Sequence, residues 1–401
     1  MESTHNRNAL IVCCLSFFTF GMTLAAIGPT LSELSEVTGS PLAAMGAIFT
    51  TTFAGSLLST LVLGPLSDRI GQQRVLWISL LIMGLGILGY SNVHSLWIML
   101  AIGFVAGLGQ GGIDLASNVI VSNLFRENST SRLNLLHFFF GFGALIGPAL
   151  VSLAIRSFGI ARIVLWITGS VMVILAGAVY LLKINLNRQE VNIEKTKTSW
   201  KSVYRSPLIW LIGLLLLLHV GVENGMGGWV TTYLQQTTLI GIAMASLATS
   251  IYWGAMTIGR LSGIFLGRKQ SNIQVLVISL VGSLIGGILF ILTVGKMVPS
   301  LIAIAVIGLT MGAVYPTVMS VVSQAFPREQ GTAVSLTASM GNIGGMLIPL
   351  LHGYILEQIS PTASTWYIAG IFLILVGLLW GISKLIINSA EKPHAIESAS
   401  L

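Results

Sequence analysis

The second half of this chain repeats the first half at an offset of about 200 residues. Residues 75–80 read VLWISL and residues 275–280 read VLVISL, so the two segments differ only at Trp77 and Val277. The same alignment pairs turn and packing residues along the chain, among them Gly143 and Pro148 with Gly344 and Pro349. A repeat of this length predicts two similar folding units, each occupying about half of the chain.

Each half is almost wholly apolar, which predicts membrane helices. The chain has 54% hydrophobic and 8% charged residues, too few charges to solvate the surface of a water-soluble protein of 401 residues. About twelve apolar stretches are long enough to span a bilayer, six on each side of a polar segment near residues 183–207. We therefore expect an all-α integral membrane protein with twelve transmembrane helices in two pseudo-symmetric six-helix bundles. The expected division is 1–183 for the first bundle, 184–206 for a linker, 207–388 for the second bundle and 389–401 for a tail.

Basic residues gather in alternate loops, which predicts the orientation of the chain in the membrane. They are Arg69, Arg74, Arg126, Arg132, Lys183, Arg188, Lys195, Lys197, Lys201, Arg205, Arg268, Lys269, Arg328, Lys384 and Lys392, whereas the intervening loops hold only Arg156, Arg162 and Lys296. This positive-inside pattern places both termini and the linker in the cytoplasm. The formal net charge of +7 thus reflects orientation in a cell (inner) membrane, and we expect the bilayer as a partner but no nucleic acid.

A turn after the second apolar stretch carries a recognisable motif. Residues 64–74 read GPLSDRIGQQR, which resembles the loop signature of the major facilitator superfamily, with glutamines at 72 and 73 where basic residues are usual. The resemblance implies a cytoplasmic gate formed by Gly64, Asp68, Arg69, Gly71 and Arg74. Gly71 would permit the tight turn, and the carboxylate of Asp68 can accept hydrogen bonds from a facing helix terminus or an arginine. The alternative is a solvated turn.

Asp114 and Glu223 are the only acidic residues well inside predicted spans. A charged side chain at the bilayer centre costs about 2.5 to 3.5 kcal/mol on insertion scales, so such residues are functional candidates. Burial favours the neutral form of a carboxyl group, which would let either residue carry a proton. We predict that both couple ion movement to transport. The alternative is that each is a structural acid bonded to a neighbouring helix.

Other polar and aromatic residues near these acids are candidates for substrate contact. Gln110, Asp114 and Asn118 share one helical face, and His219 shares another with Glu223. The predicted substrate-binding residues are Gln110, Asn118, His219, Asn224, Trp253, Tyr315 and Asn342, and His137 is expected to support Asp114. Either histidine could instead be a core residue, and the aromatic residues could face lipid or form an interfacial belt, an alternative favoured for Trp229 and Tyr233. Arg260 is expected to latch helices or snorkel rather than bind substrate.

Three segments resemble a narrower family. Residues 107–118, GLGQGGIDLASN, and 135–144, LLHFFFGFGA, resemble the fucose–proton symporter family and its glucose-transporting branches. Residues 218–224, LHVGVEN, are similar to the seventh span of its hexose–proton members, although the acid of fucose symporters in span one is missing. The resemblance implies secondary active uptake of a hexose-like monosaccharide by alternating access. We expect H+ as the coupling ion, with Na+ as the alternative, and a functional monomer without a cofactor.

Three alternatives remain open. Residues 143–148, GALIGP, match the first part of a signature of proton-driven drug or small-molecule efflux antiporters, but Val151 and Ser152 replace the glycine pair that closes it. A drug pocket would be mostly apolar, whereas the predicted mid-span residues are polar. A second alternative is a nutrient sensor with a transporter fold, although the short loops of this chain give it little to signal through. An enzyme is disfavoured because no nucleophile–base pair, metal cluster or phosphate loop is evident.

Overall fold

The computed structural model describes residues 2–125, 129–181, 200–267, 269–326 and 329–397, and the regular structure in these ranges is entirely helical. Twelve helices are long and apolar enough to cross a membrane, which confirms the predicted all-α, twelve-span fold. Some predicted features lie outside the described residues: Arg126, Lys183, Arg188, Lys195, Lys197, Arg268, Arg328, most of the linker, the last four residues of the tail, the surroundings of Gly64, and the side chains of Asp68 and Arg69.

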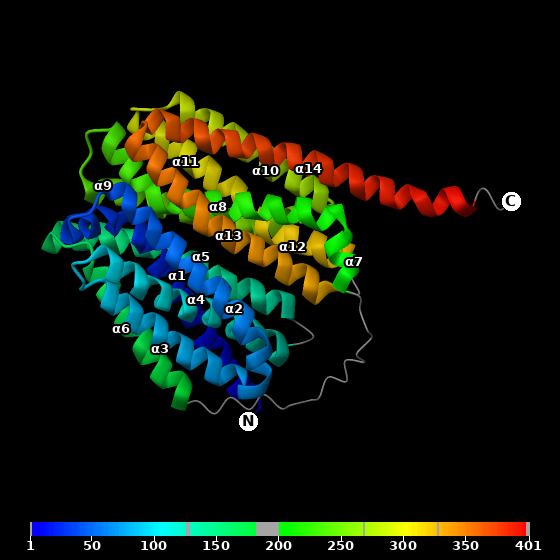
Figure 1. Cartoon of the computed structure of the whole chain (residues 1–401), viewed down its shortest axis with the longest axis horizontal. Coiled ribbons are helices and arrows are strands. Elements are labelled where there is room, and N and C mark those ends of the chain that lie inside the picture. The colour runs from blue at the N-terminus through cyan, green and yellow to red at the C-terminus, as the bar shows by residue number, and fades with distance from the viewer. Residues whose placement is uncertain (1, 126–128, 182–199, 268, 327–328, 398–401) are drawn as a thin grey trace.

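Two groups of helices form two lobes that lie side by side (Figure 1). The N-terminal lobe contains α1 (Glu2–Thr38), the short 3-10 helix η1 (Leu42–Gly46), α2 (Ala47–Ile70), α3 (Gln72–Tyr90), α4 (Leu96–Leu124), α5 (Ser129–Phe158) and α6 (Ile163–Leu181). The C-terminal lobe contains α7 (Trp200–Arg205), α8 (Pro207–Thr237), α9 (Ile242–Gly267), α10 (Asn272–Leu292), α11 (Met297–Met311), α12 (Val314–Ala325), α13 (Gln330–Gln358) and α14 (Pro361–Glu397).

The tenth span is divided into α11 and α12, whereas its repeat equivalent, α4, is continuous. Pro316 explains the break, because it has no N–H to bond the carbonyl of Gly312 and its ring crowds that carbonyl. The interruption therefore falls at Gly312 and Ala313, and Tyr315 is the second residue of α12.

Within each lobe, repeat-related glycines bring the helices into backbone contact. A Cβ atom on Gly143 of α5 would lie 1.9 Å from the carbonyl oxygen of Phe18 in α1, and one on Gly344 of α13 would lie 1.8 Å from that of Leu217 in α8. Only glycine permits such an approach, as at the small-residue interfaces of membrane helices. The glycine–proline segment of α5 therefore has a packing role that its equivalent in α13 shares.

The loops distinguish the two ends of the helix bundle, which we call the basic end and the opposite end. The basic end carries the turn at Gly71 and the residues around Lys269, and the opposite end carries the loops at residues 91–95 and 238–241. Large exposed aromatic side chains occur near both ends, with Trp97 and Trp366 at the opposite end and Tyr180 and Trp210 at the basic end. This distribution is typical of aromatic belts at membrane interfaces.

Trp229 and Tyr233 do not belong to such a belt, and that interpretation of them is wrong. Their side chains are 0% and 1% exposed, inside the C-terminal lobe. The indole N–H of Trp229 donates a hydrogen bond of 2.8 Å to the carbonyl oxygen of Pro349 in α13. Burial of an indole requires such a partner, and here it ties α8 to α13.

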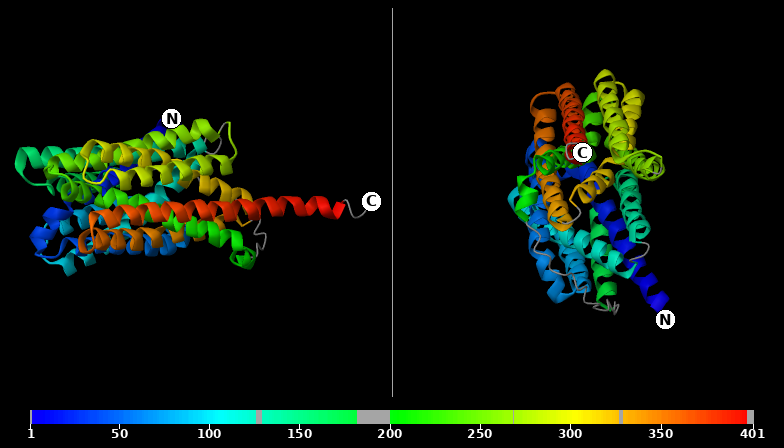
Figure 2. Two further views of the ribbon diagram at one scale, coloured as in Figure 1. Left: turned by 90° about the horizontal axis from the view of Figure 1, so that it is seen from above. Right: turned by 90° about the vertical axis from the view of Figure 1, so that its right-hand side faces the viewer.

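The lobes meet from the opposite end to somewhat past the middle of α5 and α9, where Phe140 meets Arg260. Thr50 in α2 donates a hydrogen bond of 2.7 Å to the carbonyl oxygen of Met346 in α13, and Ser152 in α5 donates to that of Ala243 in α9. By contrast, α4 packs mainly on α1, α2, α3 and α5, and α12 on α8, α10, α11 and α13, all in their own lobes. The described parts of the lobes are thus joined at the opposite end and separate toward the basic end. Figure 2 shows the two groups of helices from two further directions.

Candidate functional site

Asp114 lies in the middle of α4 and is nevertheless exposed. Its Oδ1 accepts a hydrogen bond of 3.0 Å from the Nδ2 of Asn118, one turn further along the same helix. Asp114 lies within electrostatic reach of Tyr315, which belongs to α12 in the other lobe. The side chain of Asp114 is exposed, and we call the region between the lobes that Asp114 and Tyr315 border the chamber.

Glu223 lies in α8 and is buried, in contrast to Asp114. Its Oε1 is 3.0 Å from the Nη2 of Arg260 in α9, and its Oε2 is 3.6 Å from the Nε2 of His219, one helical turn away. The hydroxyl of Tyr252 donates to the backbone carbonyl oxygen of Glu223 over 3.2 Å. Glu223 is thus held by a cation and by neighbours from its own lobe.

Arg260 also contacts the N-terminal lobe. Its guanidinium carbon lies 5.6 Å from the centroid of the Phe140 ring in α5, a cation–π arrangement. The ring of Trp253 meets the same phenylalanine edge-on, with centroids 6.2 Å apart. Arg260 therefore combines a latch between helices with an ion pair in the core, and only the latch was expected. Phe140 was not singled out, although it belongs to the aromatic run that precedes Gly141.

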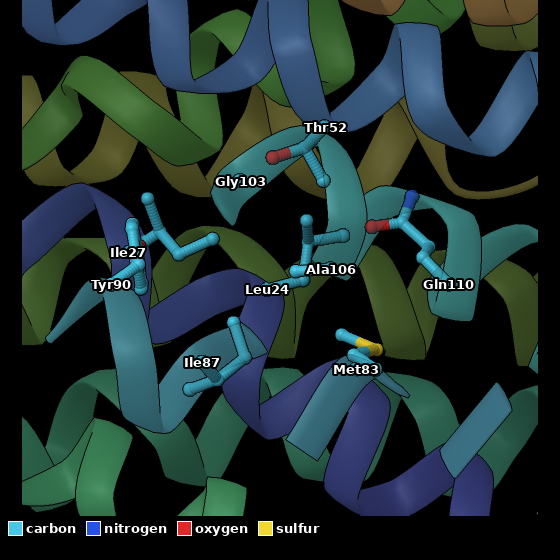
Figure 3. A pocket seen from close by; sticks show the side chains of 9 residues that line it. All are labelled: Leu24, Ile27, Thr52, Met83, Ile87, Tyr90, Gly103, Ala106 and Gln110. Carbon is cyan, nitrogen blue, oxygen red and sulfur yellow. The ribbon is translucent and has the colours of Figure 1, made fainter. Parts of the chain in front are cut away.

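Gln110 points away from the chamber into the N-terminal lobe. With Thr52, Met83 and Tyr90 it lines a small pocket between α1, α2, α3 and α4 (Figure 3). The Oε1 of Gln110 and the hydroxyl of Tyr90 are buried without a hydrogen-bond partner. The pocket has room for about one water molecule, which would satisfy such atoms.

The remaining candidates occupy varied surroundings. His137 is half-buried, and its ring meets that of Phe17 edge-on with centroids 5.4 Å apart. Asn224 is buried and its Nδ2 donates to the carbonyl oxygen of Val220 over 2.9 Å, within α8. Trp253 is 2% exposed with its indole N–H unpartnered, and Tyr315 and Asn342 are half-buried.

The turn between α2 and α3 has the conformation that its sequence predicts. Gly71 has a φ of 90°, a backbone region that favours glycine. The Nε2 of Gln72 donates to the hydroxyl of Ser67 over 2.9 Å, and that of Gln73 donates to the carbonyl oxygen of Val179 in α6 over 2.7 Å. These glutamines, which depart from the superfamily pattern, therefore brace the turn, while Arg74 is exposed.

The charges around the chamber do not cancel. Among the side chains that the structure describes there, Asp114 and Glu223 supply two carboxylates, and Arg260 supplies one fixed positive charge, which already pairs with Glu223. The described residues contain no group of three or more histidine, cysteine, aspartate or glutamate side chains that could hold a metal ion. With both carboxylates ionised the site has an excess negative charge, which favours a cation or proton over an anionic solute.

Two repeated lobes of membrane helices, joined at one end around a polar chamber, define a secondary transporter. Residues 13–327 and 237–397 match the Major Facilitator Superfamily, and the chain belongs to this family of transporters, which are not enzymes. The family agrees with the resemblance carried by residues 64–74.

The names of similar curated proteins refer to different solutes. The chain is 25% identical over 359 residues to sodium-dependent glucose transporter 1 of Xenopus laevis, covering 83% of this chain and 73% of that protein. It is 26% identical over 336 residues to the nitrite extrusion protein of Bacillus subtilis, covering 82% of this chain and 80% of that protein.

Solved structures share the fold at lower identity. The nucleoside transporter NupG superposes with a TM-score of 0.76 at 16% identity, covering 95% of this chain and 99% of that one. A bacterial homolog of the human lysosomal transporter Spinster gives a TM-score of 0.79 at 13% identity, covering 95% and 97%.

Proposed function

We propose that this transporter takes up a hexose-like monosaccharide together with H+ by alternating access. The proposal rests on two carboxylates that border the same chamber but differ in burial and in ion pairing. Glu223 is buried and ion-paired with Arg260, whereas Asp114 is exposed beside Asn118. One carboxylate without a counter-charge provides a place for a coupling proton.

The polar groups of the chamber suit a neutral, hydroxyl-rich solute. Asn118, Asp114 and the hydroxyl of Tyr315 offer both donors and acceptors, which sugar hydroxyls require. Similarity to relatives named as glucose transporters supports the same solute class. The excess negative charge disfavours an anion such as nitrite, the solute in the name of another relative.

Proton coupling is favoured over sodium coupling by the backbone at the carboxylates. Sodium sites in transporters draw on carbonyl groups freed by unwound helices. Both α4 and α8 run without interruption past Asp114 and Glu223, so the carbonyl groups there stay engaged within their helices. The carbonyl group freed in the broken tenth span belongs to Gly312, and a Na+ gradient tests whether it holds a cation. A proton needs only the carboxylates themselves.

The basic end would face the cytoplasm of the cell in which the protein resides. Basic residues concentrate in the loops of that end, as the positive-inside rule requires for cytoplasmic loops. Both termini would then also be cytoplasmic. The arrangement described here would be the cytoplasm-open state, which a symporter adopts when it releases its cargo.

Transport by the purified protein in liposomes tests this function. Labelled hexoses should exchange in counterflow, and an inward pH gradient should drive accumulation against the sugar gradient, whereas a Na+ gradient should not. Accumulation driven by Na+ alone would refute proton coupling but leave sugar uptake intact. Movement of nitrite or of cationic dyes, without any hexose, would refute the sugar assignment and favour efflux.

A further inference from the structure

One corner of the C-terminal lobe, at the basic end, gathers exposed aromatic and basic side chains. It is formed by α7, the start of α8 and the part of α14 that runs beside them (Figure 1). Leu211 of α8 meets α14 at Gly381, where an added Cβ atom would lie 3.6 Å from the Cδ1 of Leu211. The surface beside this contact, which we call the α7–α14 corner, consists of Tyr204, Arg205, Trp210, Trp380 and Lys384.

The two tryptophans of the corner lie on the same side of the contact between α8 and α14. Helix α8 starts at the basic end and α14 starts at the opposite end, so the two helices are antiparallel. Trp210 and Trp380 each stand one residue before the contact. In an antiparallel pair, one step back along each chain turns both side chains to the same side of the seam. Their side chains are 45% and 64% exposed, so the corner presents two aromatic rings to the membrane.

Each tryptophan of the corner lies beside a basic residue. The Nζ of Lys384 is 3.8 Å from the centroid of the Trp380 ring, a cation–π contact. The indole N–H of Trp210 donates a hydrogen bond of 2.9 Å to the carbonyl oxygen of Tyr204, whose peptide bond leads directly to Arg205. Arg205 and Lys384 are exposed, and neither forms an ion pair with an acidic side chain that the structure describes. The corner therefore carries two positive charges that await a counter-charge from outside the described protein.

Apolar surface continues from the corner toward the middle of the membrane. Leu214, one turn after Trp210, is exposed, and so is Leu373, two turns before Trp380. Between these positions of α14, a Cβ atom at Gly377 would meet nothing within 4 Å. A soluble anion gains nothing from this surface, whereas an acyl chain does. Two cations, two amphipathic rings and an apolar strip together match the chemistry of an anionic phospholipid.

We propose that the α7–α14 corner binds an anionic phospholipid of the surrounding bilayer. The side chains of Arg205 and Lys384 contact its phosphate group. The rings of Trp210 and Trp380 lie beside its glycerol and ester groups, where one face is apolar and one edge is polar. One acyl chain follows the seam between α8 and α14. The lipid thereby fastens α7 to α14, and this role depends on neither the solute nor the coupling ion of the transporter.

Native mass spectrometry of the full chain in detergent measures this binding directly. Each basic residue near an anionic lipid surface contributes about fivefold to binding. The wild-type protein should therefore retain one phosphatidylglycerol about 25-fold more tightly than phosphatidylcholine. Arg205→Gln and Lys384→Gln should each weaken the retention of phosphatidylglycerol about fivefold, and the double variant about 25-fold. Arg205→Lys and Lys384→Arg keep the charge and should retain most of the affinity.

A matched variant and a second measurement separate this site from general attraction of anionic lipid. Lys269→Gln removes an exposed charge at the same end of the same lobe, in the turn between α9 and α10, and should leave the retention unchanged. Phosphatidylglycerol nanodiscs should raise the thermal unfolding temperature of the wild type above that in phosphatidylcholine, but not that of the double variant. Equal retention of both lipids by the wild type, or an equal loss in Lys269→Gln, would overturn the proposal. Stabilisation by inorganic phosphate as large as that by phosphatidylglycerol would also overturn it, because a free anion would then suffice.

Discussion

Replacing Gly345 with valine should part the lobes at the opposite end. Gly345 of α13 faces the ring of Phe53 in α2, and a Cβ atom there would lie 2.7 Å from both Cδ1 and Cε1 of that ring. Favourable carbon–carbon contact needs about 3.5 to 4.0 Å, so the lobes must separate locally by roughly 1 Å. Valine adds two further methyl groups to this conflict.

The free-energy cost of this steric clash is comparable to the free-energy differences between the conformational states of a transporter. Overpacking a tight interface typically costs about 1 to 3 kcal/mol. Since about 1.4 kcal/mol corresponds to a tenfold change in a population ratio, Gly345→Val should shift the balance toward opening at the opposite end by roughly 5- to 150-fold. The conflict vanishes once the two lobes part, so the whole cost acts on the state described here.

Pairs of spin labels at the two ends would measure the shift. Labels at Asn92→Cys and Leu239→Cys, on exposed loops of different lobes, should move apart, while labels at Arg74→Cys and Lys269→Cys should move closer. Gly370→Val is the matched control, because a Cβ atom at Gly370 meets nothing within 4 Å.

Removal of the facing ring provides an internal check. Phe53→Ala in the Gly345→Val background should restore the original distances, since the clash needs both partners. Unchanged distances in Gly345→Val, together with normal thermal stability, would refute the reasoning, because they would mean that the ring yields without moving the lobes.

Three further variants test other parts of the structure. Asp114→Asn should abolish accumulation driven by a pH gradient while counterflow survives, and normal accumulation would remove this carboxylate from coupling. Trp229→Phe loses the hydrogen bond that ties α8 to α13 and leaves part of the buried space of the indole unfilled, so thermal unfolding should show a loss of about 1 to 3 kcal/mol. Gly71→Ala places a side chain at a φ of 90° and should destabilise the protein by about 1 kcal/mol or more, whereas Gly370→Ala should not.

The membrane topology could be predicted from the sequence because its causes are local. Apolar length decides whether a segment spans a bilayer, and the repeat decides that two lobes exist. The identity of Asp114 and Glu223 as intramembrane acids follows from their place within such segments. The turn at Gly71 is equally local, since its φ depends on one residue.

The partners of those acids could not be predicted, because helical periodicity describes a face but not the helix that covers it. Gln110 and Asp114 are one turn apart, yet Gln110 lines a pocket inside the N-terminal lobe and Asp114 borders the chamber. Trp229 and Tyr233 resemble belt residues in the sequence, but α13 and α10 cover them. Several neighbours surround each helix, and only packing decides which side chains meet.

By itself, the sequence determined a two-lobed bundle of twelve membrane helices. It also determined that two carboxylates lie within this bundle, where a charged group is energetically unfavourable. The tertiary structure alone decided that Glu223 is paired with Arg260, that Arg260 rests on Phe140 of the other lobe, and that the lobes separate at the basic end. The physical reason is that the two kinds of interaction act over different distances along the chain. Bilayer insertion acts on each segment separately, whereas ion pairing and lobe contact depend on residues far apart in the chain and on the relative tilt of two rigid bodies.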